Sequence, residues 1–318
     1  MLNITRLQLL REVANRKTIA ATAEAFFMTP SAVSQQLSTL EREAKVPLLE
    51  KDGRGVKLTN AGHLLVKNSE EIFAAIERAE AELVDARHGI TGNIRLSAFP
   101  TTARWLLVPS VVQLRERHPN LTLQISDLEP EEAIPMLGAG ELDVVVYYEW
   151  NVLPSIPIAG VRTYDLVTER VYLGIPSKHP LALQKEPIKL ADLADEFWIV
   201  GREATSMLQL VFAATAQAGF SPRATFQSMD FKVILSAVEA GLGIALIPPL
   251  AFIGEKHDVV YKTLADMNLH RTVKAAVRKG SEYSPLISTV LAALSAQARV
   301  VQKRLDGIPE EIEDNVTP

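Results

Sequence analysis

Residues 18–43, T-I-A-A-T-A-E-A-F-F-M-T-P-S-A-V-S-Q-Q-L-S-T-L-E-R-E, decide the fold of the N-terminal part of the chain. The run that follows Thr18 is rich in alanine, whose small side chain lets a second helix approach closely. Threonine is a good N-cap and proline is favoured at the first helical position, so Thr29-Pro30 predicts that a new helix begins at residue 30. Its inner face would carry Val33, Leu37 and Leu40. The stretch therefore predicts two packed helices joined by a short turn.

The outer face of the second helix consists of short polar side chains with little charge. Serine, threonine and glutamine can hydrogen-bond to base edges in the major groove, and a helix N-terminus can receive a phosphate. The same face could equally be an ordinary solvated helix surface, because sequences that imitate a helix-turn-helix are common. If the helix binds DNA, its candidate contacts are Thr29, Pro30, Ser31, Ser34, Gln35 and Ser38.

The residues after this helix predict a β-hairpin. Residues 46–51 read as a strand, residues 52–55 (Asp-Gly-Arg-Gly) as a tight turn, and residues 56–58 as the returning strand. A basic hairpin directly after a helix-turn-helix is typical of a wing, whose tip reaches flanking phosphates or the minor groove. This combination favours the DNA-binding interpretation. The candidate contacts of the wing are Lys51, Arg54 and Lys57.

Together, residues 18–43 and V-P-L-L-E-K-D-G-R-G-V-K-L-T-N-A-G, residues 46–62, resemble the signature of the LysR-type transcriptional regulators. The chain departs from that signature at a few positions. Lys45 stands where the family usually has glycine, Leu49 where it has phenylalanine and Thr22 where it has alanine, and Pro30-Ser31 replaces a common Gln-Pro pair. The fold expectation is unaffected, but the departures leave in doubt any base contact transferred to positions 30 and 31.

A long helix is predicted from residue 59, with Thr59 as its N-cap, to about residue 88. Apolar residues along it recur at alternating steps of three and four, which is the pattern of a coiled coil. Packing against the chain's own body would give the same pattern. The resemblance implies antiparallel packing with the same helix of a second subunit, so that two heads face two half-sites on DNA. The candidate dimerisation residues are Leu65, Ile72, Ile76, Ala79 and Leu83.

From residue 90 onwards, predicted strands alternate with predicted helices, which indicates a parallel sheet with crossovers. The motifs E-R-H-P-N-L (116–121), E-L-D-V-V-V (141–146) and G-L-G-I-A-L-I-P (241–248) resemble LysR-type effector domains. The expected fold class is therefore α/β multi-domain, with a winged helix-turn-helix (1–58), a linker helix (59–89) and a two-lobed, periplasmic-binding-protein-like effector domain (90–300). Lobe I would span about 90–162 and 268–300, and lobe II about 163–267. Residues 301–318 read as an acidic, disordered tail.

Ligands of open α/β sheets bind where strand C-termini and helix N-termini converge, which here is the cleft between the lobes. Hydroxyls at a helix start, at Thr101 and Thr102, could hold a carboxylate or could merely cap the helix. Arg202 at the cleft rim points to an anionic effector, although a salt bridge to Glu203 or a solvated loop would explain it as well. Tyr147 and Tyr148 end a lobe I strand and could line the cleft, or they could be core or surface aromatics. The candidate effector contacts are Pro100, Thr101, Thr102, Tyr147, Gly201, Arg202, Gln227 and Ser228.

Charge and composition agree with DNA binding confined to the head. Residues 1–67 hold 10 Lys+Arg against 6 Asp+Glu, whereas the remaining residues hold 23 against 32. No apolar run approaches the ~18 residues of a membrane span, and the N-terminus lacks the pattern of a secretory signal. The chain contains no cysteine, which excludes disulfides and thiolate zinc sites and suits a cytoplasmic protein.

Nothing in the sequence indicates an enzyme, a metal site or a cofactor. The six histidines lack metal-ligand spacing, and the nucleophile-elbow, phosphate-loop and dinucleotide motifs do not occur. The expected partners are double-stranded promoter DNA, a small-molecule effector, a second or further copies of the chain (homodimer or homotetramer) and RNA polymerase. Effector binding would close the cleft and change dimer packing, and thus the spacing or bend of the bound DNA. A protein-binding regulator, or a solute-binding module whose head does not bind DNA, remains the alternative.

Overall fold

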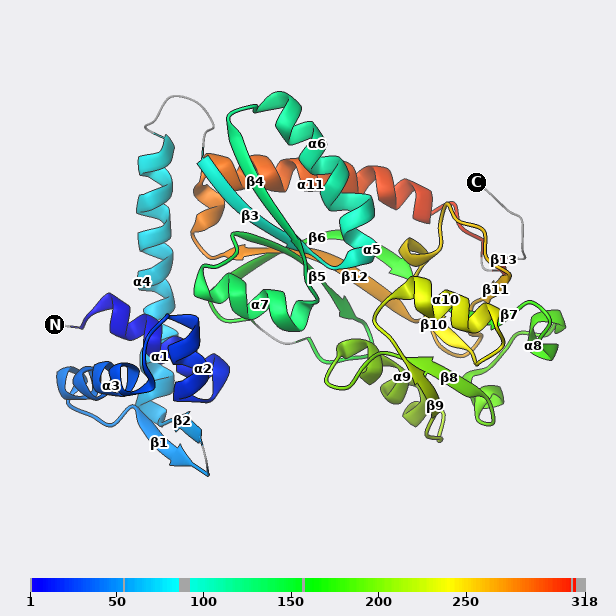
Figure 1. Cartoon of the computed structure of the whole chain (residues 1–318), viewed down its shortest axis with the longest axis horizontal. Coiled ribbons are helices and arrows are strands. Elements are labelled where there is room, and N and C mark those ends of the chain that lie inside the picture. The colour runs from blue at the N-terminus through cyan, green and yellow to red at the C-terminus, as the bar shows by residue number, and fades with distance from the viewer. Residues whose placement is uncertain (1, 54, 86–91, 156–157, 310, 313–318) are drawn as a thin grey trace.

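The computed structural model describes residues 2–53, 55–85, 92–155, 158–309 and 311–312, and it arranges them as a head, a long helix and a two-lobed body (Figure 1). The head consists of α1 (Ile4–Arg16), α2 (Ile19–Ala25) and α3 (Pro30–Ala44), followed by the hairpin of β1 (Leu49–Asp52) and β2 (Gly55–Leu58). The predicted winged helix-turn-helix is confirmed.

Local chemistry explains where the head helices begin. The Oγ1 atoms of Thr18 and Thr29 accept hydrogen bonds from the backbone N–H groups of Ala21 and Ala32, both at 3.2 Å, so each threonine caps the helix that follows it. The inner face predicted for α3 is buried as expected, and it packs in the head core with α1. The core residues of α3 are Val33, Leu37 and Leu40.

The linker helix α4 (Asn60–Asp85) lies upright beside the head and reaches toward the body (Figure 1). Thr59 caps it, since its Oγ1 accepts a hydrogen bond from the backbone N–H of Gly62 at 3.0 Å. Residues 86–88, which the sequence also assigned to this helix, lie outside the described residues.

Lobe I is built on a five-stranded sheet of order β4-β3-β5-β12-β6. β4, β3 and β5 are parallel, and β12 runs antiparallel to both of its neighbours, β5 and β6, so the expected parallel sheet is in fact mixed. Helices α6 and α11 pack on each other and on this lobe, and α7 packs beside β5. The bounds are β3 (Gly92–Ala98), α5 (Pro100–Thr102), the π-helical turn η1 (Ala103–Leu107), α6 (Val108–Arg117), β4 (Leu121–Asp127), α7 (Pro130–Ala139), β5 (Val144–Trp150), β6 (Val161–Arg170), β12 (His270–Arg278), the 3-10 turn η4 (Ser281–Tyr283) and α11 (Pro285–Leu305).

Lobe II contains a sheet of order β10-β7-β11-β13 and a parallel pair, β8 and β9. Its elements are β7 (Tyr172–Pro176), α8 (Pro180–Leu183), η2 (Leu190–Leu193), β8 (Phe197–Val200), α9 (Ser206–Gln217), β9 (Arg223–Gln227), α10 (Phe231–Glu239), β10 (Ala245–Ile247), η3 (Pro249–Ala251), β11 (Val259–Lys262) and β13 (Glu311–Ile312). Within the described ranges, no helix is long and apolar enough to cross a membrane.

Two expected boundaries need correction. Residues 163–170 were assigned to lobe II, but β6 pairs with β12 along its whole length and therefore belongs to the sheet of lobe I. The disordered tail was expected from residue 301, but α11 continues to Leu305 and β13 pairs with β11. The hydroxyl of Tyr172 donates to the carbonyl oxygen of Pro309 at 2.8 Å, so the segment after α11 is held on lobe II by polar contacts that its acidic composition did not suggest.

Candidate functional site

The predicted recognition face of α3 is exposed at every position assigned to it: Thr29, Pro30, Ser31, Ser34, Gln35 and Ser38. Thr29 Oγ1, besides capping the helix, lies 3.0 Å from Ser31 Oγ. Continuing the step of four residues from Ser34 and Ser38 leads to Arg42, which is also exposed and whose Nη2 donates to Thr39 Oγ1 at 2.9 Å. Sequence reasoning missed Arg42, although the helical period would have found it. The face thus combines uncharged hydrogen-bonding groups with one cation at its far end.

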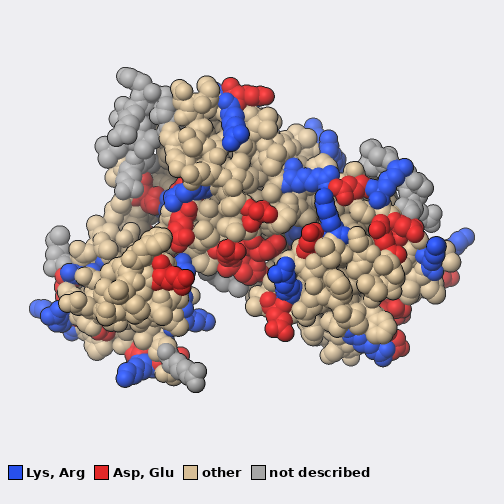
Figure 2. Space-filling model, in the orientation of Figure 1, with Lys and Arg blue, Asp and Glu red and all other residues tan. Residues whose placement is uncertain are grey.

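The wing carries its two described lysines on opposite faces. Lys51 pairs across the hairpin with Val56, and Lys57 pairs with Glu50 at the next register position. Lys57 Nζ lies 3.4 Å from Glu50 Oε1, and both side chains are more than half exposed, so this ion pair is weak. The third predicted contact, Arg54, lies outside the described residues. Figure 2 shows basic side chains at the outer edge and lower end of the head.

The apolar face of α4 divides into two parts. Ile72 is 41% exposed and Ala79 is also exposed, so both are available to a second subunit, while Ile76 is half-buried. Leu65 is half-buried and packs against the core of its own head, so its place in a dimer seam stays a prediction. Leu64, one residue earlier, is 60% exposed and falls outside the heptad pattern. The side chain of Leu83 lies outside the described residues.

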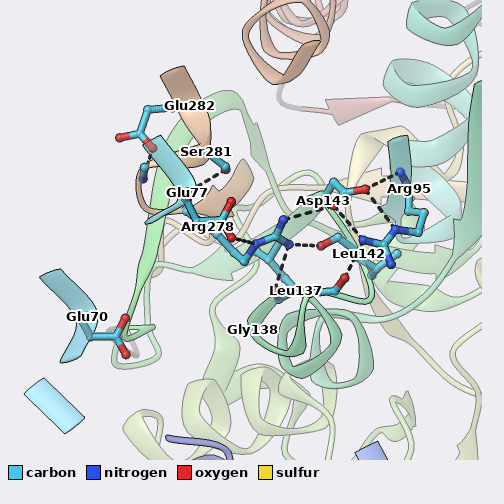
Figure 3. A network of polar contacts seen from close by, with 12 residues as sticks. Glu70, Glu77, Arg95, Leu137, Gly138, Leu142, Asp143, Arg278, Ser281 and Glu282 are labelled. Atoms are coloured by element: carbon cyan, nitrogen blue, oxygen red, sulfur yellow. Dashed lines mark hydrogen bonds and ion pairs between the residues drawn. The ribbon is translucent and has the colours of Figure 1, made fainter. Parts of the chain in front are cut away.

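A polar joint connects the head and α4 to lobe I of the same chain (Figure 3). Arg278, the last residue of β12, places its Nε 2.6 Å from Glu77 Oε1 of α4 and its Nη2 3.2 Å from Asp143 Oδ1. Its Nη1 donates to the carbonyl oxygen of Leu142 at 2.6 Å. From the head, Arg11 Nη2 donates to the carbonyl oxygen of Gly138 at 2.7 Å. The guanidinium of Arg278 therefore holds the linker helix α4 against lobe I.

Close backbone approach supports this joint. A Cβ atom on Gly280 would lie 2.3 Å from the carbonyl oxygen of Ala74, so only glycine allows this loop to touch α4. Gly280 also has φ +101°, a left-handed conformation that glycine adopts without strain. Glu70 of α4 lies in the same region, and its burial raises the pKa of its carboxyl group.

A cavity of about 100 Å³ lies between the two lobes. A cavity of this volume has room for more than one water molecule, and so for a small ligand. Lobe I lines it with Phe99, Pro100, Thr101, Arg104, Glu129, Tyr148, Trp150 and Arg271, and lobe II with Met207, Met229, Asp230, Phe231, Lys232, Leu250 and Ala251. Acidic and basic side chains alternate on the surface between the lobes (Figure 2).

A buried ion pair stands at the base of this cavity. Arg271 Nε donates to Glu169 Oε1 at 2.8 Å, and the side chains are only 1% and 0% exposed. Arg271 Nη2 also lies 3.3 Å from Thr101 Oγ1, which accepts its hydrogen bond. The other carboxylate oxygen of Glu169 accepts from the backbone N–H of Leu250 in lobe II at 3.0 Å. The pair therefore joins three segments that meet at the cleft.

Aromatic rings enclose the guanidinium. Its Cζ lies 4.9 Å from the ring centre of Phe99, 5.2 Å from that of Tyr148 and 5.5 Å from that of Trp150. Trp150 is 4% exposed, and its buried Nε1 finds no acceptor within the described part of the chain. A buried donor without an acceptor costs free energy unless a ligand or water satisfies it.

Glu129 is a carboxyl group of the cavity lining whose pKa is strongly shifted. Burial, followed by the nearby charge of Glu131, raises the pKa of its carboxyl group to about 7, against the lowering effect of a hydrogen bond from Tyr148. The hydroxyl of Tyr148 donates to Glu129 Oε2 at 3.3 Å. At neutral pH this carboxyl group is therefore divided between its neutral and charged forms.

The structure places only part of the predicted effector set around this cavity. Pro100 and Thr101 line it, whereas Thr102 is fully buried beneath the helix start. Tyr147 points to the opposite face of β5, into the cluster beside α7, so its neighbour Tyr148 takes the position assigned to it. In lobe II, Gly201, Arg202, Gln227 and Ser228 do not line the cavity. Ser228 Oγ instead accepts from the backbone N–H of Asp230 at 3.1 Å, just before α10.

Comparison with known families gives two matches in chain order. A family model described as "Bacterial regulatory helix-turn-helix protein, lysR family" matches residues 4–63, and one described as "LysR substrate binding domain" matches residues 87–299. The second match alone spans more than half of the chain.

Individual relatives agree with these matches. The transcriptional dual regulator GltC of Bacillus subtilis is 26% identical over 254 residues, covering 79% of this chain and 82% of GltC. The DNA-binding transcriptional dual regulator OxyR of Escherichia coli is 27% identical over 308 residues, covering 96% and 97%. The crystal structure of full-length CbnR complexed with its target DNA superposes with a TM-score of 0.52 at 21% identity, covering 93% of this chain and all of that one (100%), which supports the shared fold.

Proposed function

Because this chain belongs to the LysR family of transcriptional regulators, and is therefore a DNA-binding regulator with an effector domain, we propose that it reads duplex promoter DNA with the exposed face of α3. The wing would contact the flanking backbone. The observation that carries this proposal is the face from Thr29 to Ser38, which is exposed, uncharged and rich in hydrogen-bonding groups. Such a face suits base edges better than it suits an acidic protein surface.

A DNA-binding titration tests this proposal. The full chain is titrated onto its own upstream intergenic DNA and onto an unrelated duplex, at about 50 and 200 mM salt. Preferential binding that weakens at least tenfold between the two salt concentrations supports phosphate and base contacts together. Failure to bind either duplex at low salt, by folded protein, would shift the function to the alternative of a head that binds protein.

We propose the cavity between the lobes as the effector site and a small anion as its ligand. Three residues that line it carry donor groups, namely the guanidinium of Arg271, the indole N–H of Trp150 and the hydroxyl of Thr101. Arg271 and Glu169 neutralise each other, so an anion would be held mainly by hydrogen bonds and by Lys232 at the rim. We propose that the protein uses no cofactor besides this effector and has no catalytic activity.

Glu129 gives this site a pH dependence that can be measured without the effector. Its pKa is raised to about 7, so the stability that its neutral form contributes is present below pH ~4.5 and is lost as pH rises through about 7. Glu129→Gln keeps the neutral state and should be more stable than the wild type at pH 8, by about 1–3 kcal/mol, and nearly equal to it at pH 5.

Thermal unfolding at the two pH values checks this prediction. Glu132→Gln, on the exposed side of the same helix, is the control and should show no difference that grows with pH. If Glu129→Gln gave the same stability change at pH 5 and pH 8, the carboxyl group would not titrate in this range.

One strand connects the cavity to the head. β12 begins near the cavity with Arg271 and ends at the joint with Arg278, which holds Glu77 of α4. We propose that ligand binding shifts β12 and alters the angle between α4 and lobe I, and thereby the spacing of the two heads in a dimer or tetramer. For this to work, the ligand must favour one arrangement by differential affinity. We also propose that the protein acts in the cytoplasm and contacts RNA polymerase at the promoter.

Glu77→Gln should loosen this joint while leaving the fold intact. The wild type is expected to prefer one half-site spacing, because the joint fixes the direction of α4. The measured quantity is the affinity for a duplex whose half-sites are moved by one or two base pairs, divided by the affinity for the preferred spacing. This ratio should be about 5–10-fold higher for the variant than for the wild type. Glu71→Gln, exposed on the same helix, is the matched control. Identical spacing profiles for both variants and the wild type would contradict a role for the joint.

A further inference from the structure

Phe27, in the turn between α2 and α3, is the most exposed large apolar residue of the described chain. Its side chain is 96% exposed, against at most 76% for any other exposed large apolar residue. Its neighbours behave differently, because Phe26 and Met28 both pack against the head core. Of these three consecutive apolar residues, only Phe27 therefore extends its side chain into solvent.

The backbone of Phe27 is also strained. Its φ is +51°, and it is the only aromatic residue among the four non-glycine residues with positive φ in the described chain. A bulky side chain in the left-handed region is a genuine outlier, whereas glycine and asparagine adopt this conformation more easily. Exposure and strain both act against phenylalanine here, so the fold alone does not explain the residue. Strained, exposed side chains that persist are most often found at binding sites.

We propose that Phe27 is a DNA contact and that its ring packs against the 5-methyl group of a thymine in the major groove. The inference rests on the proposed function, in which α3 enters that groove. Phe27 lies two residues before Thr29, the N-cap of α3, and both residues are exposed. Apart from Pro30, the exposed face of α3 offers only polar side chains up to Ser38, so Phe27 supplies the one extended aromatic surface beside it. Apolar contact with the methyl group is one way in which proteins distinguish thymine from the other bases.

The test compares stability and DNA binding in the same variant. Phe27→Asn relieves the backbone strain and should raise the unfolding midpoint of the full chain by about 2–4 °C. It should nevertheless weaken binding to the preferred duplex about tenfold, where that duplex is selected from random-sequence DNA with the wild-type protein. A purely structural role for Phe27 would move both quantities in the same direction.

Replacing thymines one at a time by deoxyuridine, which lacks only the 5-methyl group, identifies the partner. One such replacement should weaken wild-type binding several-fold and leave the Phe27→Asn variant unaffected. Val46→Ala, which truncates another exposed apolar residue of the head, is the control and should respond to every replacement as the wild type does.

Three results would overturn the assignment: undiminished affinity of Phe27→Asn, a loss that is the same with thymine and with deoxyuridine at every position, or a fall in the unfolding midpoint. If the wild-type protein selected no preferred duplex from random-sequence DNA, that result would instead count against the proposed function. It would be known before the variant is made.

Discussion

Glu169→Ala is expected to lower the free energy of unfolding of the effector domain by about 3–5 kcal/mol. The variant leaves the guanidinium of Arg271, 1% exposed, without its counter-charge. It also removes the acceptor of the backbone N–H of Leu250. An uncompensated buried charge and an unpaired buried donor are both costly, and here a single substitution creates both.

Urea unfolding followed by tryptophan fluorescence measures this loss, because Trp150 lies against Arg271 and reports on the same region. Asp195→Ala is the matched control, since its ion pair with Arg223 is exposed, at 92% and 55% of the two side chains, and should contribute little. Glu169→Gln keeps hydrogen-bonding capacity and should lose less than the alanine variant.

Removing both charges separates the ion pair from the space it fills. Glu169→Leu combined with Arg271→Met should recover much of the stability lost in Glu169→Ala, because apolar residues of similar size often replace a buried pair without loss. The double variant should still lose the response to a small anion. A loss below about 1 kcal/mol in Glu169→Ala would mean that water reaches the guanidinium and that the base of the cavity is not sealed.

The head could be predicted almost completely from local sequence. The starts of α2 and α3 depend on threonine caps, the core of α3 depends on a period of 3.6, and the wing depends on a turn of glycine and aspartate. These signals act over a few residues, so a single sequence is enough to predict them. The backbone strain at Phe27 could not be predicted, because nothing in the sequence indicates which of two adjacent phenylalanines is exposed.

The sequence could predict where the effector cavity lies but not most of the residues that line it. Thr101 lines it and Thr102 does not, because consecutive residues at a helix start point in different directions. Tyr147 and Tyr148 illustrate the period of two in a strand, where choosing the wrong neighbour reverses the face. The central pair, Arg271 and Glu169, joins residues 102 apart in the sequence, and no local pattern marks such a contact.

Gln35→Ala is expected to reduce discrimination between the preferred duplex and its single-base variants by about 1–3 kcal/mol, which is roughly 5- to 150-fold. The amide of Gln35 has both a donor and an acceptor, so it can form two hydrogen bonds to one adenine. Its side chain is exposed on α3, six residues beyond the N-cap Thr29 and on the side of the helix opposite the buried Val33 and Leu37. Loss of this amide should therefore act on one base pair rather than on the whole site.

Binding titrations with the preferred duplex, its variants and an unrelated duplex check the prediction. Lys51→Ala provides the contrast, because a lysine on the wing that contacts phosphate should weaken binding to all duplexes alike and reduce the salt dependence. Gln36→Ala, which removes the neighbouring amide that accepts a hydrogen bond from Arg6 at 2.8 Å, controls for general damage to the helix. If Gln35→Ala weakened every duplex equally, the residue would be a backbone contact, and base reading would have to come from Ser34 or Ser38. A change confined to one position would instead identify the base pair that faces Gln35 and fix the register of the helix in the groove.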